Sequence, residues 1–250
     1  MSTDTNTSTL YRYGKSFNTH DLIKVVAILI MVIDHVGYYL LGDNPWWRMV
    51  GRIGLPMWYF LIGYVNKLRI NYFLIAYGMI LSITGTLVYK TLWFDILLNF
   101  IAYQILLHFF PVERISTLWR AIFFVLLLPV NYLIYNHVEY GILGIYFIYS
   151  SRMIAINDPQ ASFWFGMSCL VFFIWQFLVF PAFFDTAILY TFAVLSVGVF
   201  YLLRNYTLKT VPCPRALLRP LLVISRYSLH IYFYHLIILQ FLWAFYIHHK

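Results

Sequence analysis

The first long apolar stretch of the sequence carries three side chains that could do chemistry. They are Lys24, Asp34 and His35, and the residues between them are almost all aliphatic. Lys24 and His35 are eleven residues apart. In an α-helix this spacing returns to within about 20° of the same face, with a rise of roughly 16 Å. One helix face would therefore carry a cation and, further along, an imidazole, separated by the length of an extended cofactor arm.

An imidazole in this position is suited to general-base catalysis, because its unperturbed pKa of about 6.5 leaves it mostly neutral at pH 7. Asp34 is adjacent to His35 and points about 100° away from it, so we expect Asp34 to orient another base or to reach a neighbouring helix. The alternatives are structural. Lys24 could be an end-anchor whose amine reaches the lipid headgroups, and Asp34 with His35 could be a buried polar pair.

Two further clusters lie in the next apolar stretch and in the last one. Arg48 and Arg52 are four residues apart, with Gly51 between them. Two guanidinium groups at this spacing can clamp an anion, and the alternative is that they bind phospholipid headgroups. In the last stretch, His235 shares a predicted helix face with Tyr232, which indicates that both point inward. A satisfied core histidine is the alternative for His235.

Membrane-spanning helices must hold these residues. The chain has 250 residues, of which 62% are apolar and only 10% are charged, whereas soluble domains carry about 25% charged residues. A soluble domain of this size could not bury so much apolar surface. We therefore predict an all-α, polytopic integral membrane helical bundle, with a polar cytoplasmic tail over 1–20 and a single transmembrane domain over 21–250.

About nine segments are long and apolar enough to cross a bilayer, within a range of eight to ten. They lie near 22–42, 53–66, 70–89, 91–110, 118–136, 139–156, 161–180, 185–203 and 223–247, and the second and sixth are the shortest. Lys and Arg are concentrated on the side of the N-terminus, which predicts a cytoplasmic N-terminus. The net charge of +8 is then explained by orientation, and we expect no nucleic acid partner.

The spacing of the cysteines and histidines predicts neither a metal site nor a disulfide. The chain has two cysteines, Cys169 and Cys213, which match neither a disulfide framework nor zinc-ligand spacing. His230 and His235 are five residues apart and so point about 140° away from each other on a helix. We expect no metal.

The order of polar and small residues at the two ends of the chain resembles a known family. The opening order is Asp21, Lys24, Ala27, Met31, Asp34 and His35, then Gly51, Arg52, Pro56 and Phe60. This order is similar to the TraX family, polytopic inner-membrane proteins of conjugative plasmids that are associated with N-terminal acetylation of F-type pilin. More distantly, Lys24 and His35 are similar to the motif that opens the wider transmembrane acyltransferase superfamily, where Arg usually stands in place of Lys24. The closing run of Ser225, Tyr227, Ser228, Tyr232 and His235 resembles that superfamily's last helix.

The resemblance implies an acyltransferase of the bacterial inner membrane that uses acetyl-CoA as co-substrate and acetylates a pilin or another envelope acceptor. His35 would be the general base, with Asp34 and His235 as further catalytic residues. Cofactor contacts are expected from Lys24, Arg226 and Arg52. Substrate contacts are expected from Arg48, Arg52, Tyr227 and Tyr232. Arg52, Tyr227, Tyr232 and His235 are all candidates for the donor that stabilises the developing oxyanion.

Three other functions fit the same residues. The protein could be a non-catalytic membrane subunit of a conjugation or secretion system, because a fold resemblance does not secure chemistry. It could transfer acetyl groups to a glycan or a lipid. It could also be a small transporter in which Asp34, His35 and Asp95 relay protons.

Overall fold

The computed structural model describes residues 16–68, 71–180 and 185–248 of the chain. Within these ranges the chain forms ten α-helices, one 3-10 turn and no strand longer than an isolated bridge. The all-α class predicted from the sequence is confirmed. Most of the predicted tail over 1–20 lies outside the described residues, and the first described helix begins at Thr19.

Seven of the described helices are long and apolar enough to cross a membrane, which makes this a multi-pass membrane protein. They are α2 (Thr19–Tyr39), α4 (Tyr72–Tyr89), α5 (Ile96–Phe109, continued by the 3-10 turn η1, Val112–Arg114), α6 (Thr117–Ile134), α8 (Ala161–Val179), α9 (Thr186–Arg204) and α11 (Ser228–His248). The predicted number of nine is not confirmed, and the cytoplasmic position of the N-terminus remains a prediction.

The second and sixth predicted spans account for the difference. They correspond to α3 (Pro45–Val65) and α7 (Leu143–Ala155), which pack against each other in the interior. Thirteen residues of α-helix rise only about 20 Å, so α7 is too short to cross a bilayer. α3 has the length, but its arginines and glycines lower its apolarity. A helix surrounded by protein does not need the apolar surface that lipid contact demands.

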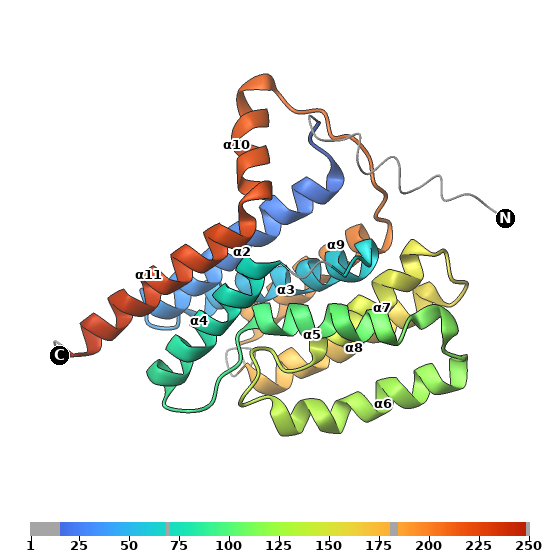
Figure 1. Cartoon of the computed structure of the whole chain (residues 1–250), viewed down its shortest axis with the longest axis horizontal. Coiled ribbons are helices and arrows are strands. Elements are labelled where there is room, and N and C mark those ends of the chain that lie inside the picture. The colour runs from blue at the N-terminus through green and yellow to red at the C-terminus, as the bar shows by residue number, and fades with distance from the viewer. Residues whose placement is uncertain (1–15, 69–70, 181–184, 249–250) are drawn as a thin grey trace.

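The last predicted span, 223–247, is two helices. α10 (Arg215–Arg226) ends before Tyr227, and α11 begins at Ser228. In Figure 1, α10 rises from the place where α2 and α11 meet and crosses the direction of α11, and it packs against α2.

Glycines allow the interior helices to approach closely. A Cβ at Gly63 of α3 would overlap the carbonyl oxygen of Ile148 in α7. A Cβ at Gly144 of α7 would overlap the ring of Tyr59 in α3. These contacts hold α3 and α7 together, and most residues of both helices are buried.

The first and last helices lie side by side and run in the same direction. Asp21 closes a capping box with Asn18 at the start of α2, and it also accepts a hydrogen bond of 2.6 Å from the hydroxyl of Ser225. Further along, the ring of Tyr39 near the end of α2 contacts the ring of Trp243 in α11. The two ends of the sequence that carry the motifs are thereby brought together.

Candidate functional site

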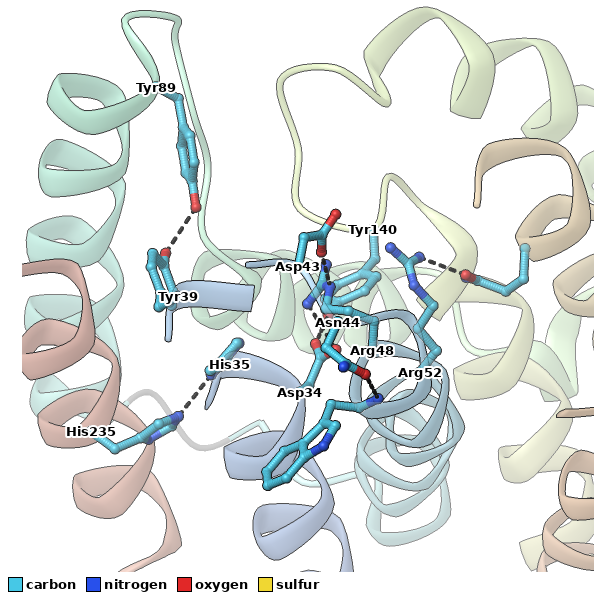
Figure 2. A network of polar contacts seen from close by, with 12 residues as sticks. Asp34, His35, Tyr39, Asp43, Asn44, Arg48, Arg52, Tyr89, Tyr140 and His235 are labelled. Carbon is cyan, nitrogen blue, oxygen red and sulfur yellow. Dashed lines mark hydrogen bonds and ion pairs between the residues drawn. The ribbon is translucent and has the colours of Figure 1, made fainter. Parts of the chain in front are cut away.

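His35 and His235 form a direct pair between α2 and α11. Nδ1 of His35 lies 2.7 Å from Nε2 of His235, and the two rings are close to parallel, with their centroids 5.0 Å apart (Figure 2). The other ring nitrogen of His235, Nδ1, lies 2.7 Å from the carbonyl oxygen of Ile231. The structure thus brings together two histidines that lie in separate segments of the sequence.

These contacts determine which ring nitrogens carry hydrogen when both rings are neutral. The carbonyl oxygen of Ile231 can only accept, so Nδ1 of His235 must donate to it. Nε2 of a neutral His235 is then an acceptor, and the donor must be Nδ1–H of His35. This leaves Nε2 of His35 unprotonated, with a lone pair available to take a proton.

Two cavities lie along α2. The first, which we call the Lys24 cavity, has a volume of about 460 Å³. Three basic residues, His20, Lys24 and Lys67, line it, and no acidic residue is among its described lining residues. Asn18 and Asn71, which cap α2 and α4, lie on its wall as well.

The second cavity, which we call the His35 cavity, has a volume of about 340 Å³. Its ionisable lining residues are of both signs, Arg48 and Arg52 against Asp95 and Glu139, with His35 beside them. Much of the remaining wall is aromatic, namely Tyr38, Tyr39, Tyr89, Trp93, Tyr135 and Tyr140.

A thin layer of side chains separates the two cavities. Along α11, Tyr232 lines the Lys24 cavity, whereas Leu236, one turn later, lines the His35 cavity. The same change occurs on α2 between Met31 and His35. At the start of α5, Asp95 lines the His35 cavity, whereas the following residue, Ile96, lines the Lys24 cavity.

A hydrogen bond ties this layer together. The hydroxyl of Tyr232 donates to Oδ2 of Asp95 at 3.1 Å, and both side chains are buried. The ring of Tyr232 also lies 5.8 Å from the ring of His35, centroid to centroid. We call His35, Asp95 and Tyr232 the partition, because a group passing from one cavity to the other must pass them.

Asp34 points away from the histidine pair, toward α3 (Figure 2). Its Oδ1 lies 2.7 Å from Nη1 of Arg48, and its Oδ2 accepts a hydrogen bond of 3.1 Å from the hydroxyl of Tyr140. Arg48 also pairs with Asp43 at 3.1 Å. The expectation that Asp34 reaches a neighbouring helix is confirmed. Asp34 is not among the described residues that line either cavity.

Arg48 and Arg52 both line the His35 cavity, as expected of a pair acting on one substrate, but each has its own protein partner. Nη1 of Arg52 donates to Oε1 of Gln176 in α8 at 2.6 Å, and its guanidinium lies 4.5 Å from the centroid of the Phe180 ring. The two guanidinium groups are therefore held toward different neighbours, Arg48 by Asp34 and Arg52 by Gln176.

Two predicted site residues lie apart from the others. Arg226 is the exposed last residue of α10, and Tyr227 is exposed at the junction with α11. Neither is among the described residues that line a cavity. Of the three predicted cofactor contacts, Lys24 lines the basic cavity, Arg52 lines the other cavity and Arg226 lines neither.

The connection between α6 and α7 supplies Glu139, which is not among the predicted catalytic and binding residues but lines the His35 cavity. Backbone hydrogen bonds between Phe94 and the residues around Val138 hold this connection against the start of α5. There Oε2 of Glu139 accepts from the backbone N–H of Ile96 at 3.0 Å, and Oδ1 of Asp95 accepts from that of Leu97 at 2.8 Å. Burial, and then the neighbouring Asp95, raise the pKa of Glu139 above its usual range.

The fold and the site define a class: a multi-pass helical membrane protein with a buried histidine pair between two cavities. The comparisons define the family. The family model described as TraX protein matches residues 19–243, and the chain therefore belongs to the TraX family, which is linked to F-pilin acetylation.

Similarity to individual proteins is limited. The chain is 31% identical over 130 residues to an uncharacterized protein of Rickettsia prowazekii (strain Madrid E). That match covers 51% of this chain and 52% of the relative, so the chain aligns with about half of the length of the curated relative that it matches. No solved structure matches the chain.

Proposed function

We propose that this protein is an acyltransferase of the bacterial inner membrane that moves acetyl from acetyl-CoA to an envelope acceptor, such as the N-terminus of a pilin. The observation that carries the proposal is the position of His35 in the partition between the Lys24 cavity and the His35 cavity. Membership of the TraX family supports the same reaction.

The Lys24 cavity has the chemistry of a donor site. CoA carries several negative charges at one end and a thin, mostly apolar arm at the other. Lys24 and Lys67, on a wall whose described residues include no carboxylate, attract the charged end. The apolar wall that includes Met31 and Phe100 suits the arm. In this proposal the thioester reaches the partition, roughly 16 Å along α2 from Lys24.

His35 removes the proton that the reaction releases. The acceptor nitrogen attacks the thioester carbonyl carbon, the C–N bond forms and the C–S bond breaks. Nε2 of His35 takes the proton from the nitrogen and returns it to the CoA thiolate. A positioned general base of this kind is typically worth about 10²–10⁴-fold in rate. His235 is the candidate for orienting His35, because its Nε2 accepts the Nδ1–H of His35. Among the predicted oxyanion donors, Arg52 lines the His35 cavity and its buried Nε–H has no hydrogen-bond partner among the described residues, so Arg52 is the candidate for stabilising the oxyanion.

The His35 cavity has the chemistry of an acceptor site for an amine. Asp95 and Glu139 lie on its wall, where their carboxyl oxygens can accept hydrogen bonds from an amine. An ammonium group must lose one proton before it can attack, and Asp95, whose pKa burial raises to about 7, can receive it in its ionised form. Arg48 and Arg52 on the same wall would then hold an anionic or carbonyl part of the acceptor.

A saccharide is the second candidate acceptor, because the His35 cavity is walled largely by Tyr and Trp side chains. Flat aromatic rings pack well against the apolar faces of sugars. In that case the nucleophile would be a hydroxyl group, and His35 would remove its proton in the same way.

The test is turnover of radiolabelled acetyl-CoA by the purified protein in lipid nanodiscs. Two peptide acceptors are compared, one with a free N-terminus and one with a blocked N-terminus, together with a saccharide. We expect transfer to the free amine and its loss in His35→Ala, while His108→Ala, at an exposed histidine of α5, keeps it. No transfer by the wild type would favour the non-catalytic subunit, and full activity in a folded His35→Ala protein would overturn the role of His35.

A further inference from the structure

We propose that Lys67 is a second donor-binding residue and contacts the 3′-phosphate of CoA, while Lys24 contacts the pyrophosphate. This inference rests on the proposed function. It starts from the observation that the two lysines line one cavity from two different segments, Lys24 from within α2 and Lys67 from just beyond the end of α3.

The two lysines lie at different depths, because α2 and α3 run in opposite directions. Gly51 of α3 packs against Asp34 of α2, and Gly54 packs against Ala27 and Ile30. Each step forward along α3 therefore meets an earlier residue of α2. The end of α3 at Val65 lies about 16 Å beyond Gly54.

This antiparallel packing places Lys67 level with the very start of α2, where Asn18 and Asn71 also line the cavity. Lys24 lies only about 5–9 Å along α2 from Ala27 and Ile30. The two ammonium groups are thus attached to the backbone about 10 Å apart along the cavity, with Lys24 nearer the partition.

This order matches the order of the phosphates in the donor. Reading from the thioester, CoA presents the pantetheine arm, then the pyrophosphate and then the ribose with its 3′-phosphate. The inner lysine would meet the pyrophosphate and the outer lysine the 3′-phosphate. From the sequence alone, Lys67 is expected only to help orient the protein in the membrane, because basic residues between two predicted spans usually serve that purpose.

The experiment uses three donors that differ only in their phosphates: acetyl-CoA, acetyl-dephospho-CoA without the 3′-phosphate, and acetyl-pantetheine without any phosphate. Three variants are compared in nanodiscs, Lys67→Met, Lys24→Met and the control Lys90→Met, which alters an exposed lysine at the end of α4 that lines neither cavity. Loss of one charged hydrogen bond at a partly exposed site weakens binding about tenfold.

We expect Lys67→Met to raise KM for acetyl-CoA about tenfold and to leave KM for acetyl-dephospho-CoA within about twofold of the wild type. Lys24→Met should raise KM for both CoA donors and leave that for acetyl-pantetheine unchanged. Lys90→Met should behave as the wild type with every donor. An equal effect of Lys67→Met on acetyl-CoA and acetyl-dephospho-CoA, or no effect on either, would overturn the assignment.

Equilibrium binding of radiolabelled CoA and dephospho-CoA separates this inference from the proposed function. If the wild type binds CoA more tightly than dephospho-CoA, and Lys67→Met removes the difference, then Lys67 binds the 3′-phosphate even if no turnover occurs. If turnover occurs but Lys67→Met does not distinguish the donors, the inference fails and the proposed function stands. If CoA does not bind at all, both fail.

Discussion

His35 donates its Nδ1 hydrogen to Nε2 of His235 across 2.7 Å, although 200 residues separate them in the sequence. The backbone carbonyl of Ile231 fixes the tautomer of His235, and His235 in turn fixes that of His35. The arrangement resembles that of the histidine in a Ser-His-Asp triad, in which one ring nitrogen is held by a hydrogen-bond partner and the other is left to take a proton.

The role of His235 is tested by replacing its acceptor nitrogen. His235→Phe keeps a ring but removes the acceptor, so we expect kcat to fall by about 10²-fold while KM for the donor stays within about twofold. His235→Gln offers an amide oxygen to Nδ1–H of His35 and should recover most of the rate. Nitrogen NMR of labelled His35 reports the tautomer directly. Unchanged kcat in His235→Phe would contradict a positioning role.

The sequence alone identifies Lys24, Asp34 and His35 as candidate functional residues, because charged residues are scarce in the predicted spans. A charged or titratable residue in a membrane helix is costly and so marks a function or a specific partner. Lys24, Asp34 and His35 stand out for that reason, and the helical period alone places His35 and Asp34 on different faces. The structure confirms this divergence, with Asp34 facing α3 and His35 facing α11.

Other features depend on packing that no local pattern contains. The contact between His35 and His235 requires α2 and α11 to lie side by side. Glu139 reaches the site because a loop is pinned to the start of α5. The apolar runs within α3 and α7 predict two further spans, whereas the structure packs these two helices against each other in the interior, where burial in protein also favours apolar runs.

We expect the Asp34–Arg48 pair to contribute to the stability of the fold rather than to proton transfer. Asp34 is 1% exposed, and removing one partner of a buried pair leaves the other charge uncompensated, which costs about 3–5 kcal/mol. We expect Asp34→Met to lower the free energy of unfolding by an amount in this range. The double variant Asp34→Met with Arg48→Met should recover most of the loss.

The control for this pair is Glu113→Gln, which breaks the more exposed ion pair with Arg152 and should change stability by less than about 1 kcal/mol. Unfolding in mixed detergent micelles gives the stabilities, and acetyl transfer is measured on the double variant. Because Arg48 also lines the proposed acceptor site, KM for the acceptor should rise in the double variant. A folded double variant whose kcat is abolished at saturating acceptor would instead show that Asp34 or Arg48 takes part in catalysis.

Gly51 is predicted to be required by the packing of α2 on α3. A Cβ at this position would overlap the side chain of Asp34, which its pair with Arg48 holds in place. We expect Gly51→Ala to destabilise the protein by about 1–3 kcal/mol. Gly166→Ala, in α8, meets no atom within 4 Å and should stabilise it by about 0.5–1 kcal/mol. Thermal unfolding of both variants gives the comparison, and equal effects would show that α2 and α3 can separate to admit a methyl group.

The pair formed by Asp95 and Glu139 predicts how stability depends on pH. Burial raises the pKa of Asp95 to about 7 and that of Glu139 above its usual range. Both carboxyl groups are protonated in either state below about pH 4. Above this pH the unfolded chain releases protons that the folded protein retains, so stability falls as the pH rises through about 7. The slope for one proton is at most about 1.4 kcal/mol per pH unit.

Asp95→Asn should flatten this decline between pH 4 and pH 7. Asparagine keeps the cap on the N–H of Leu97 and has no carboxyl proton to release. The matched control is Asp185→Asn, which alters the same kind of cap at the exposed start of α9 and should leave the wild-type pH dependence in place. The measurement is the unfolding midpoint of each protein in nanodiscs at half-unit pH steps. A stability that rises over this range in the wild type, or one that falls equally steeply in Asp95→Asn, would mean that the carboxyl of Asp95 does not hold its proton in the folded protein.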